Sequence, residues 1–298
     1  MKHLIKIAAY STALFIFWSC DNTTKADAYG NFEATEITVS AQANGQLMTF
    51  TVDEGKLIKK GTTVGIVDTL PLYLNKQQLL ANKQIIFAKS KGVLSQIAVL
   101  KAQLTTANSN LQRIQNLFKA KSATKKQLDD ALGKVSVLKQ QIKSIETQNT
   151  AVVNEAKSVV AQLKQVEDKI TKSYIKNPSN GTVLVKYAEP GEITAFGKPL
   201  YKIADLGTME LRVYVSEPQL AHLKIGQKVT VKIDAGKAMK NYKGIVTWVA
   251  SEAEFTPKII QTKEERVNLV YAVKIDVKND GSLKIGMPAE MWLNTTKK

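Results

Sequence analysis

This chain of 298 residues contains only one cysteine and two histidines. A single cysteine excludes an internal disulfide, and no thiol beyond Cys20 remains for a metal cluster or a nucleophile. His3 lies in the first 20 residues, and His222, in PQLAHLKIG, is more simply a surface residue at a helix end than a catalytic base. The numbers of serine, lysine and acidic residues do not exclude a catalytic mechanism that uses them, but the sequence contains no recognisable motif for one. We therefore predict no enzyme activity, no catalytic residues and no metal site.

Proline is missing from a long central segment, with none between Pro71 and Pro178. Because proline breaks helices and strong helix formers fill this gap, the segment is predicted to be helical. Apolar residues follow the alternating three-and-four spacing of a coiled-coil seam. In the first half they are Leu72, Leu79, Ile86, Val93, Ile97, Leu100, Leu104, Ala107, Leu111, Ile114 and Phe118. In the second half they are Leu128, Ala131, Val135, Leu138, Ile142, Ile145, Val152, Ala156, Val159, Leu163, Val166 and Ile170.

The two helical halves are similar in length, so each can bury its stripe against the other in an antiparallel hairpin. The polar stretch KAKSAT separates them and places the turn between Phe118 and Thr124. Thr124 and Gln127 have the spacing of a capping box at the start of the second helix. Only Asn149 interrupts the second stripe, and a single polar residue in a seam can set the register at some cost in stability.

Acidic residues are few beside basic ones, since 42 Lys and Arg against 26 Asp and Glu give a net charge of +16. Residues 72–172 hold sixteen Lys and one Arg against six acidic residues, a net charge of +11. Such an excess favours an anionic partner, which could be nucleic acid, lipid headgroups or an acidic protein surface. Within the hairpin the charge is either a solvated helix face or a means of steering toward acidic rims on a partner, which would make association sensitive to salt.

The N-terminus contains a short apolar run. Basic residues precede an apolar stretch over residues 7–18 that is too short to span a bilayer, which is the layout of a secretory signal peptide. Cys20 follows the small residue Ser19, and this resembles a bacterial lipoprotein signal whose cysteine carries the lipid anchor, although Phe17 and Trp18 are bulkier than usual. The alternative is an ordinary cleaved signal with an incidental cysteine. Both interpretations place the chain across the inner membrane and argue against nucleic acid as a partner.

Outside the hairpin, short alternating segments separated by Gly and Pro predict β-strands. The segments are LMTFTV, TVLVKY, LRVYV, KVTVKI, GIVTWV, VYAVKI and AEMWL. One phrase occurs twice, as NGQLMTFTVDEG at 44–55 and NGTVLVKYAEPG at 180–191, so that equivalent residues are 136 positions apart. Matching glycines imply matching turns and matching apolar residues imply the same buried face. Each copy is therefore predicted to be half of one small sheet domain, and the hairpin returns the chain so that the halves meet.

This combination resembles the HlyD-type membrane fusion proteins, the periplasmic adaptors of bacterial efflux and secretion systems, from about Gly30 to Leu293. The phrases that carry the resemblance are SAQANGQLMTFTVDEGKLIKKGTTVGIVD, NPSNGTVLVKYAEPGEITAFGKPLYKIADL, LRVYVSEPQLAHLKIGQKVTVKI and LKIGMPAEMWL. It implies an α+β fold in which a long antiparallel α-helical coiled-coil hairpin is inserted into a split lipoyl-like (biotinyl-like) β domain, followed by a β-barrel. The expected domains are a lipoprotein-type signal peptide at 1–20, lipoyl-like half-domains at 40–71 and 173–206, the hairpin at 72–172, and a β-barrel domain with the C-terminal strand at 207–298, together with 30–39.

The same resemblance implies a docking site at the hairpin tip. In the family, the tip meets a TolC-like outer-membrane channel through an Arg, a Leu four residues later and a Ser eleven residues later. Arg113 and Leu117 match this pattern, and Thr124 replaces the Ser but keeps a hydroxyl. Arg113 and Leu117 are one helical turn apart and off the predicted seam, so they are expected to share an exposed face. The alternative is an ordinary surface pair, with Thr124 serving only as the helix cap.

For function, the resemblance implies a periplasmic adaptor that links an inner-membrane ABC transporter, an ATPase plus permease, to the TolC-like channel for efflux or secretion of small molecules. EFTPKIIQTKEERVNLVYAVKI is most similar to adaptors of ABC exporters. The alternatives are an adaptor of a proton-driven pump and a structural coiled-coil envelope tether. Cys20 is the expected lipid anchor in the inner membrane, and Asp21 resembles a signal that retains lipoproteins there. Family members commonly form hexamers, so a homo-oligomer is expected.

The split domain also resembles the carriers of lipoyl and biotin groups. Those carriers place the modified lysine on the turn that joins their two halves, whereas this chain has DTLP at 68–71 and then the hairpin. Lys59 and Lys60 flank Gly61 inside the first half-domain and are interpreted as an exposed turn. We therefore expect no lipoyl or biotin cofactor.

Overall fold

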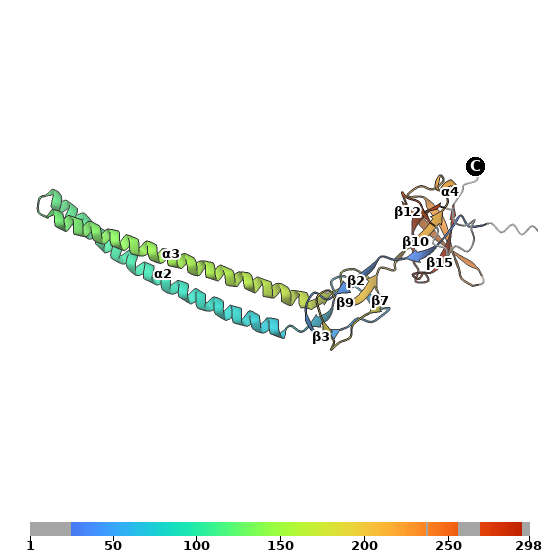
Figure 1. Cartoon of the computed structure of the whole chain (residues 1–298), viewed down its shortest axis with the longest axis horizontal. Coiled ribbons are helices and arrows are strands. Elements are labelled where there is room, and N and C mark those ends of the chain that lie inside the picture. Colours follow the sequence, from blue (N-terminus) through green and yellow to red (C-terminus); the bar gives the residue numbers. More distant parts are fainter. Residues whose placement is uncertain (1–24, 237, 256–268, 294–298) are drawn as a thin grey trace, which may run out of the picture. The chain divides into compact units, whose positions relative to one another are not determined.

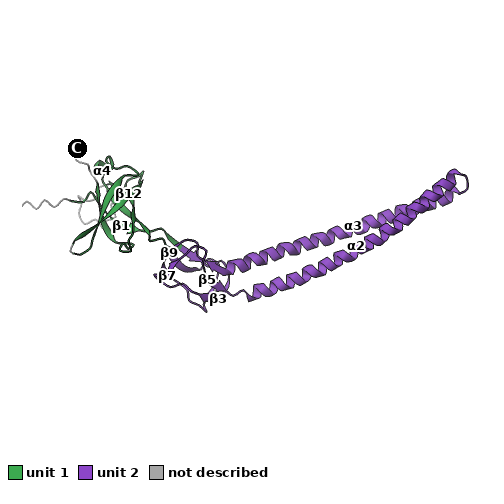
Figure 2. Ribbon diagram, turned by 180° about the vertical axis from the view of Figure 1, so that it is seen from behind, with its two compact units in different colours: residues 1–37, 203–298 green, residues 38–202 purple. Residues whose placement is uncertain are grey.

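The computed structural model describes residues 25–236, 238–255 and 269–293. The predicted signal segment with Cys20 therefore lies outside the described residues. The chain divides into two compact units, one made of residues 1–37 and 203–298 and the other of residues 38–202 (Figure 2). Because the second unit interrupts the first, the chain leaves the first unit near residue 37 and re-enters it near residue 203.

Unit 38–202 contains the helical hairpin. Helix α2 spans Leu70–Lys119 and helix α3 spans Lys125–Ser173, and the two run side by side and antiparallel (Figure 1). Pro71 stands in the first turn of α2, where a missing backbone donor costs nothing. The Asp68 carboxylate accepts a hydrogen bond from the Leu70 amide at 2.9 Å. Helix α3 continues directly into strand β6, Tyr174–Lys176.

The seam between α2 and α3 has the predicted three-and-four spacing, but it contains more polar residues than the sequence pattern indicated. Lys76, Lys83 and Ser90 occupy half-buried positions between the apolar ones. Ser90 Oγ donates to Asn149 Oδ1 across the hairpin at 3.3 Å. The two polar side chains thus face each other, and a shift of one heptad would place Asn149 opposite Lys83 or Ile97 and break this hydrogen bond.

The lipoyl-like domain consists of two four-stranded sheets that each combine strands from both sequence copies. One sheet has the order β6-β5-β3-β8 and the other the order β2-β9-β7-β4, in which β2 is Glu36–Ser40. The strands of the first copy are β3 (Gly45–Phe50), β4 (Leu57–Ile58) and β5 (Thr63–Val67). Those of the second are β7 (Gly181–Lys186), β8 (Ile193–Thr194) and β9 (Pro199–Ala204). The predicted split domain with an inserted hairpin is confirmed.

Hydrogen bonds between the two copies come in pairs related by the sequence repeat. The Leu47 amide donates to the Glu192 carbonyl at 2.8 Å, and the equivalent Val183 amide donates to the Lys56 carbonyl at 3.0 Å. Further pairs are Gly191 N to Leu47 O with Gly55 N to Val183 O, and Phe196 N to Asn44 Oδ1 with Lys60 N to Asn180 Oδ1. Each copy supplies the donors that the other needs. This reciprocity explains why the same phrase appears twice.

The buried side chain of Asn177 lies outside this symmetric pattern and forms further hydrogen bonds between the two halves. Asn177 is 1% exposed, and its Nδ2 lies 2.6 Å from the Ser179 carbonyl and 3.2 Å from the carbonyls of Ile58 and Lys59. Its Oδ1 accepts a hydrogen bond from the Tyr201 hydroxyl at 2.8 Å. Burial raises the pKa of Tyr201 to about 12, so the phenol is neutral and able to donate.

The other unit is a β-barrel. Its sheet has the order β10-β1-β15-β11-β12-β14-β13, and a further pairing of β10 with β14 closes the barrel. The strands are β1 (Ala28–Glu33), β10 (Thr208–Val215), β11 (Lys228–Asp234), β12 (Met239–Val249), β13 (Glu254–Phe255), β14 (Leu269–Lys278) and β15 (Pro288–Leu293). A short helix α4, Glu217–Leu220, follows β10. Alternate residues of each strand fill the core, as in Met209, Leu211 and Val213.

Part of the expected assignment of residues 30–39 to the barrel is wrong. Strand β1 does pair with β10 and β15 of the barrel, but strand β2, Glu36–Ser40, pairs with β9 of the lipoyl-like domain. The physical reason is that Val39 and Ala41 are buried in that domain, where the Ala41 amide donates to the Lys198 carbonyl at 2.9 Å. The chain therefore changes domain between β1 and β2.

Candidate docking site at the hairpin tip

The tip is a tight turn of residues 120–124 closed by backbone hydrogen bonds. The Lys121 amide donates to the Phe118 carbonyl at 3.0 Å, and the Ser122 amide donates to the Leu117 carbonyl at 2.8 Å. Lys121 has a φ of 55°, the left-handed conformation in which glycine is usual at a helix end. These bonds satisfy the last carbonyls of α2 and hold the turn in one conformation.

Thr124 forms the predicted capping box at the start of α3. Its Oγ1 accepts from the Gln127 amide at 3.2 Å, and Gln127 Oε1 accepts from the Thr124 amide at 2.8 Å. The Thr124 hydroxyl also lies 3.2 Å from Gln127 Oε1, to which it can donate. The hydroxyl of this exposed residue is thus occupied within the cap, and its role in the structure is to begin α3.

Arg113 and Leu117 lie exposed on the last turns of α2, away from the seam. Leu117 is 41% exposed, and Arg113 Nη2 donates to Asn110 Oδ1 at 2.6 Å, which limits the positions of the guanidinium. They are four positions apart in the helix, so their backbones are separated by about 6 Å along the axis. An apolar side chain and a five-donor cation are therefore presented one turn apart within the last two turns of α2.

The sequence pattern missed Phe118 as part of this surface. We predicted Phe118 in the seam, but its side chain is 39% exposed. The reason is that Phe118 is in the last turn of α2 and α3 begins only at Lys125, so only the first turn of α3 is available to cover it. Its position at the end of the stripe, immediately before a polar turn, was the available signal. Leu117 and Phe118 together give the tip two neighbouring exposed apolar side chains.

The tip is also strongly cationic. Between residues 113 and 128 there are five basic residues, Arg113, Lys119, Lys121, Lys125 and Lys126, and no acidic one. All five are exposed. None of the acidic side chains in the described part of the chain forms an ion pair with them, whereas other hairpin lysines do, such as Lys89 with Glu155 at 3.3 Å.

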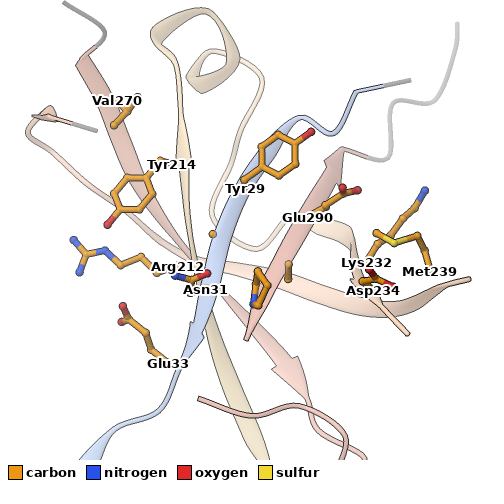
Figure 3. Close-up of a pocket in the computed structure, with 13 residues that line it drawn as sticks. Tyr29, Asn31, Glu33, Arg212, Tyr214, Lys232, Asp234, Met239, Val270 and Glu290 are labelled. Atoms are coloured by element: carbon orange, nitrogen blue, oxygen red, sulfur yellow. The ribbon is translucent and has the colours of Figure 1, made fainter. Parts of the chain in front are cut away.

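A second candidate site is a cleft of about 790 Å³ on the outer face of the barrel (Figure 3). Arg212 and Tyr214 of β10 lie on one side of β1, and Lys232 and Asp234 of β11 lie on the other. Arg212 Nη2 is paired with the Glu254 carboxylate at 2.9 and 3.1 Å, so its charge is already balanced.

None of the described residues that line the cleft is a Ser, Thr, Cys or His. His222 lies exposed just beyond α4, as the sequence predicted. Among residues 25–236, 238–255 and 269–293 there is no group of three or more His, Cys, Asp or Glu side chains placed to bind a metal ion. In the same residues, no helix is long and apolar enough to cross a membrane.

The arrangement of a long hairpin, a split lipoyl-like domain and a barrel is that of the membrane fusion proteins. MacA from Actinobacillus actinomycetemcomitans superimposes with a TM-score of 0.59 at 22% identity, over 89% of this chain and 76% of MacA. The membrane fusion protein Spr0693 from Streptococcus pneumoniae gives a TM-score of 0.52 at 17% identity, over 88% of this chain and 96% of that protein. At such identities the likeness establishes the shared fold.

The sequence also matches relatives along nearly its whole length. A UPF0194 membrane protein of Yersinia pseudotuberculosis is 30% identical over 298 aligned residues, which cover 91% of this chain and 90% of the relative. This chain therefore belongs to the UPF0194 membrane protein family. No protein-family model matches it.

Proposed function

We propose that this protein is the periplasmic adaptor of a tripartite exporter and links an inner-membrane ABC transporter to a TolC-like outer-membrane channel. The observation that carries the proposal is the hairpin. Helix α2 has 50 residues, and at 1.5 Å per residue it extends about 75 Å. The hairpin is inserted in a domain closed by reciprocal hydrogen bonds and ends in an exposed tip. A long rigid arm with a structured tip suits the bridging of two separated partners.

In this proposal the tip residues make the contact with the channel. Leu117 would lose its exposed apolar area on docking, and Arg113 would supply fixed hydrogen-bond donors beside it. Thr124 would contribute by holding the turn through its cap, and it adds a polar surface next to the other two. The role of each residue comes from the spacing that this chain shares with the family pattern.

Self-association of the hairpins, as a hexamer or another ring, is part of the proposal. One side of the hairpin exposes Tyr73, Phe87 and Leu94, and Phe87 lines an apolar groove of about 340 Å³ between the helices. On α2, Ile85 and Val99 are 66% and 59% exposed. They belong to the opposite side by their heptad positions. In a closed ring, one surface of each copy contacts a different surface of the next copy. Two different apolar sides of the hairpin provide such a pair of surfaces.

The assignment to an ABC transporter rests on the resemblance of residues 254–275 to adaptors of that class. The anchoring of Cys20 in the inner membrane rests on the resemblance of the first 20 residues to a lipoprotein signal. The neighbouring genes test the first point, because an ATPase and a permease beside this gene would support it and a proton-driven pump would overturn it. The mass of the mature N-terminal peptide tests the second.

The function is tested by deleting the gene and restoring it with variants. We expect deletion to raise the intracellular accumulation of at least one compound from a panel of dyes and antibiotics. The wild type should restore export, whereas Arg113→Asp and Leu117→Ser should fail although the proteins are folded and abundant. Leu132→Ser is the matched control, because Leu132 is 44% exposed on the other helix and should tolerate the change. Full export by both tip variants would defeat the docking assignment.

The same strains separate an adaptor from a structural envelope tether. Loss of a tether should alter the spacing between the membranes or the integrity of the envelope without changing the accumulation of any compound. Electron microscopy of the deletion strain measures the spacing. A changed spacing with unchanged accumulation would reject the exporter and support the tether.

A further inference from the structure

The basic residues at the hairpin tip are placed where helix physics disfavours them. Lys125 and Lys126 are the first two residues of α3, and the first turn of that helix contains no acidic residue. The N-terminus of a helix carries a partial positive charge, so two lysines there are repelled by the helix itself. Lys121 takes the left-handed conformation that costs least for glycine. Three lysines thus stand at positions where other residues would be more stable.

These lysines also form no ion pair. None of the five basic residues of the tip is paired with an acidic side chain of the described residues, and Asp129 and Asp130, one helical turn after Lys125 and Lys126, are not within ion-pair distance of them. A sequence that breaks local stability rules at one exposed place does so most often for function. The unpaired positive charge of the tip is therefore the property to explain.

We propose that Lys121, Lys125 and Lys126 bind an acidic protein surface at the periplasmic end of the outer-membrane channel and select that partner by charge. This inference rests on the proposed function and names the chemistry of the partner. Leu117 and Phe118 supply the apolar centre of the contact, while the lysines surround it and steer the approach. The charges act mainly on the rate of association, because exposed rim charges change encounter more than residence.

A protein surface fits this tip better than a lipid surface. Binding in the membrane interface requires an amphipathic helix with an extended apolar face. The tip offers only two neighbouring exposed large apolar side chains, beside a turn held by the Lys121 and Ser122 amides. A rigid turn with a small apolar centre and a cationic border complements a rim of fixed acidic side chains.

The test uses charge reversal that does not weaken the hairpin. In the full-length protein, Lys121→Glu, Lys125→Glu and Lys126→Glu are combined. Glutamate at the start of α3 is favoured by the helix dipole, so the variant should melt no lower than the wild type. A matched control combines Lys134→Glu, Lys139→Glu and Lys143→Glu, which changes the net charge equally at exposed positions of α3 away from the tip. Loss of binding with retained stability can then be assigned to the tip charges.

Association is measured with the host's TolC-like channel in nanodiscs, at about 50 mM and about 500 mM salt, where the Debye length falls from about 14 Å to about 4 Å. For the tip variant we expect the association rate constant to fall by about tenfold or more at low salt, with a smaller difference at high salt. The control variant should stay within about threefold of the wild type, because its charges lie about 12 to 26 Å beyond Lys126 along α3, where salt screens their effect on the contact more strongly.

Several results would overturn the inference, and they are distinguishable from failure of the proposed function. An equal loss in both charge variants would show that total charge acts rather than the tip lysines. Unchanged binding of the tip variant, together with lost binding of Leu117→Ser, would reject the acidic partner surface but keep the channel contact. Wild-type binding to phosphatidylglycerol vesicles in place of the channel would make the tip a lipid-binding element. Absence of channel binding by the wild type would refute the proposed function itself.

Discussion

The buried side chain of Asn177 is predicted to hold the two halves of the lipoyl-like domain together, and Asn177→Ala tests this directly. The substitution removes the amide that lies near the carbonyls of Ser179, Ile58 and Lys59, and it removes the acceptor of the Tyr201 hydroxyl. Two of the three carbonyls that lose this donor belong to the first sequence copy, whereas Asn177 belongs to the segment that precedes the second. The effect should therefore appear at the junction of the copies.

The magnitude follows from the contacts. The amide can donate two hydrogen bonds and accept one, and each contributes about 1 kcal/mol to stability. The Tyr201 side chain is fully buried, so its unpaired hydroxyl adds a penalty of about 1–3 kcal/mol. We therefore expect Asn177→Ala to destabilise the domain by about 4–6 kcal/mol at most, and by about 3 kcal/mol if water enters the space. Tyr201→Phe, which removes one bond, should cost about 1–2 kcal/mol.

Hydrogen exchange measured by mass spectrometry reports the effect locally. Peptides covering residues 55–67 and 181–204 should exchange roughly 100-fold faster or more, because each 1.4 kcal/mol is tenfold. Peptides from the barrel should be unchanged. Asn180→Ala is the matched control, since Asn180 is an exposed asparagine of the same turn that accepts only from the Lys60 amide. If Asn177→Ala and Asn180→Ala changed exchange equally, the reasoning about the buried amide would be refuted.

Two further predictions concern the barrel and the hairpin. Gly30→Ala should destabilise the barrel by about 3 kcal/mol or more, because a Cβ at Gly30 would stand 1.8 Å from the Arg212 carbonyl oxygen and force β1 away from β10. Denaturant unfolding followed by the fluorescence of Trp248 and Trp292 measures this loss of stability. An unchanged unfolding midpoint would contradict the prediction. Replacing Ser90 and Asn149 together by Leu should raise the melting temperature of the hairpin, because an apolar pair in a seam is more stable than a polar one. Circular dichroism at 222 nm measures the melting temperature. A lower melting temperature would show that the polar pair contributes more stability than an apolar pair at the same positions.

Much of the hairpin could be predicted because it depends on residues close together in the sequence. The spacing of the apolar stripe, the turn after Phe118 and the Thr124 capping box are properties of contiguous segments, and the structure confirms all three. Phe118 itself was misplaced, because the stripe does not reveal where the opposite helix begins. The docking roles of Arg113 and Leu117 stay predictions, since the structure shows their exposure and not their partner.

The sequence by itself determined that the chain has two copies of one sheet motif separated by two long helices. Helical periodicity, missing proline and repeated glycines act through local backbone geometry, which does not depend on distant residues. Only the tertiary structure decided that each copy donates to the other, that Ser90 faces Asn149, and that β2 leaves the barrel for the lipoyl-like domain. These choices depend on which donors and apolar faces meet across separations of 59 residues or more, and a linear pattern does not contain that information.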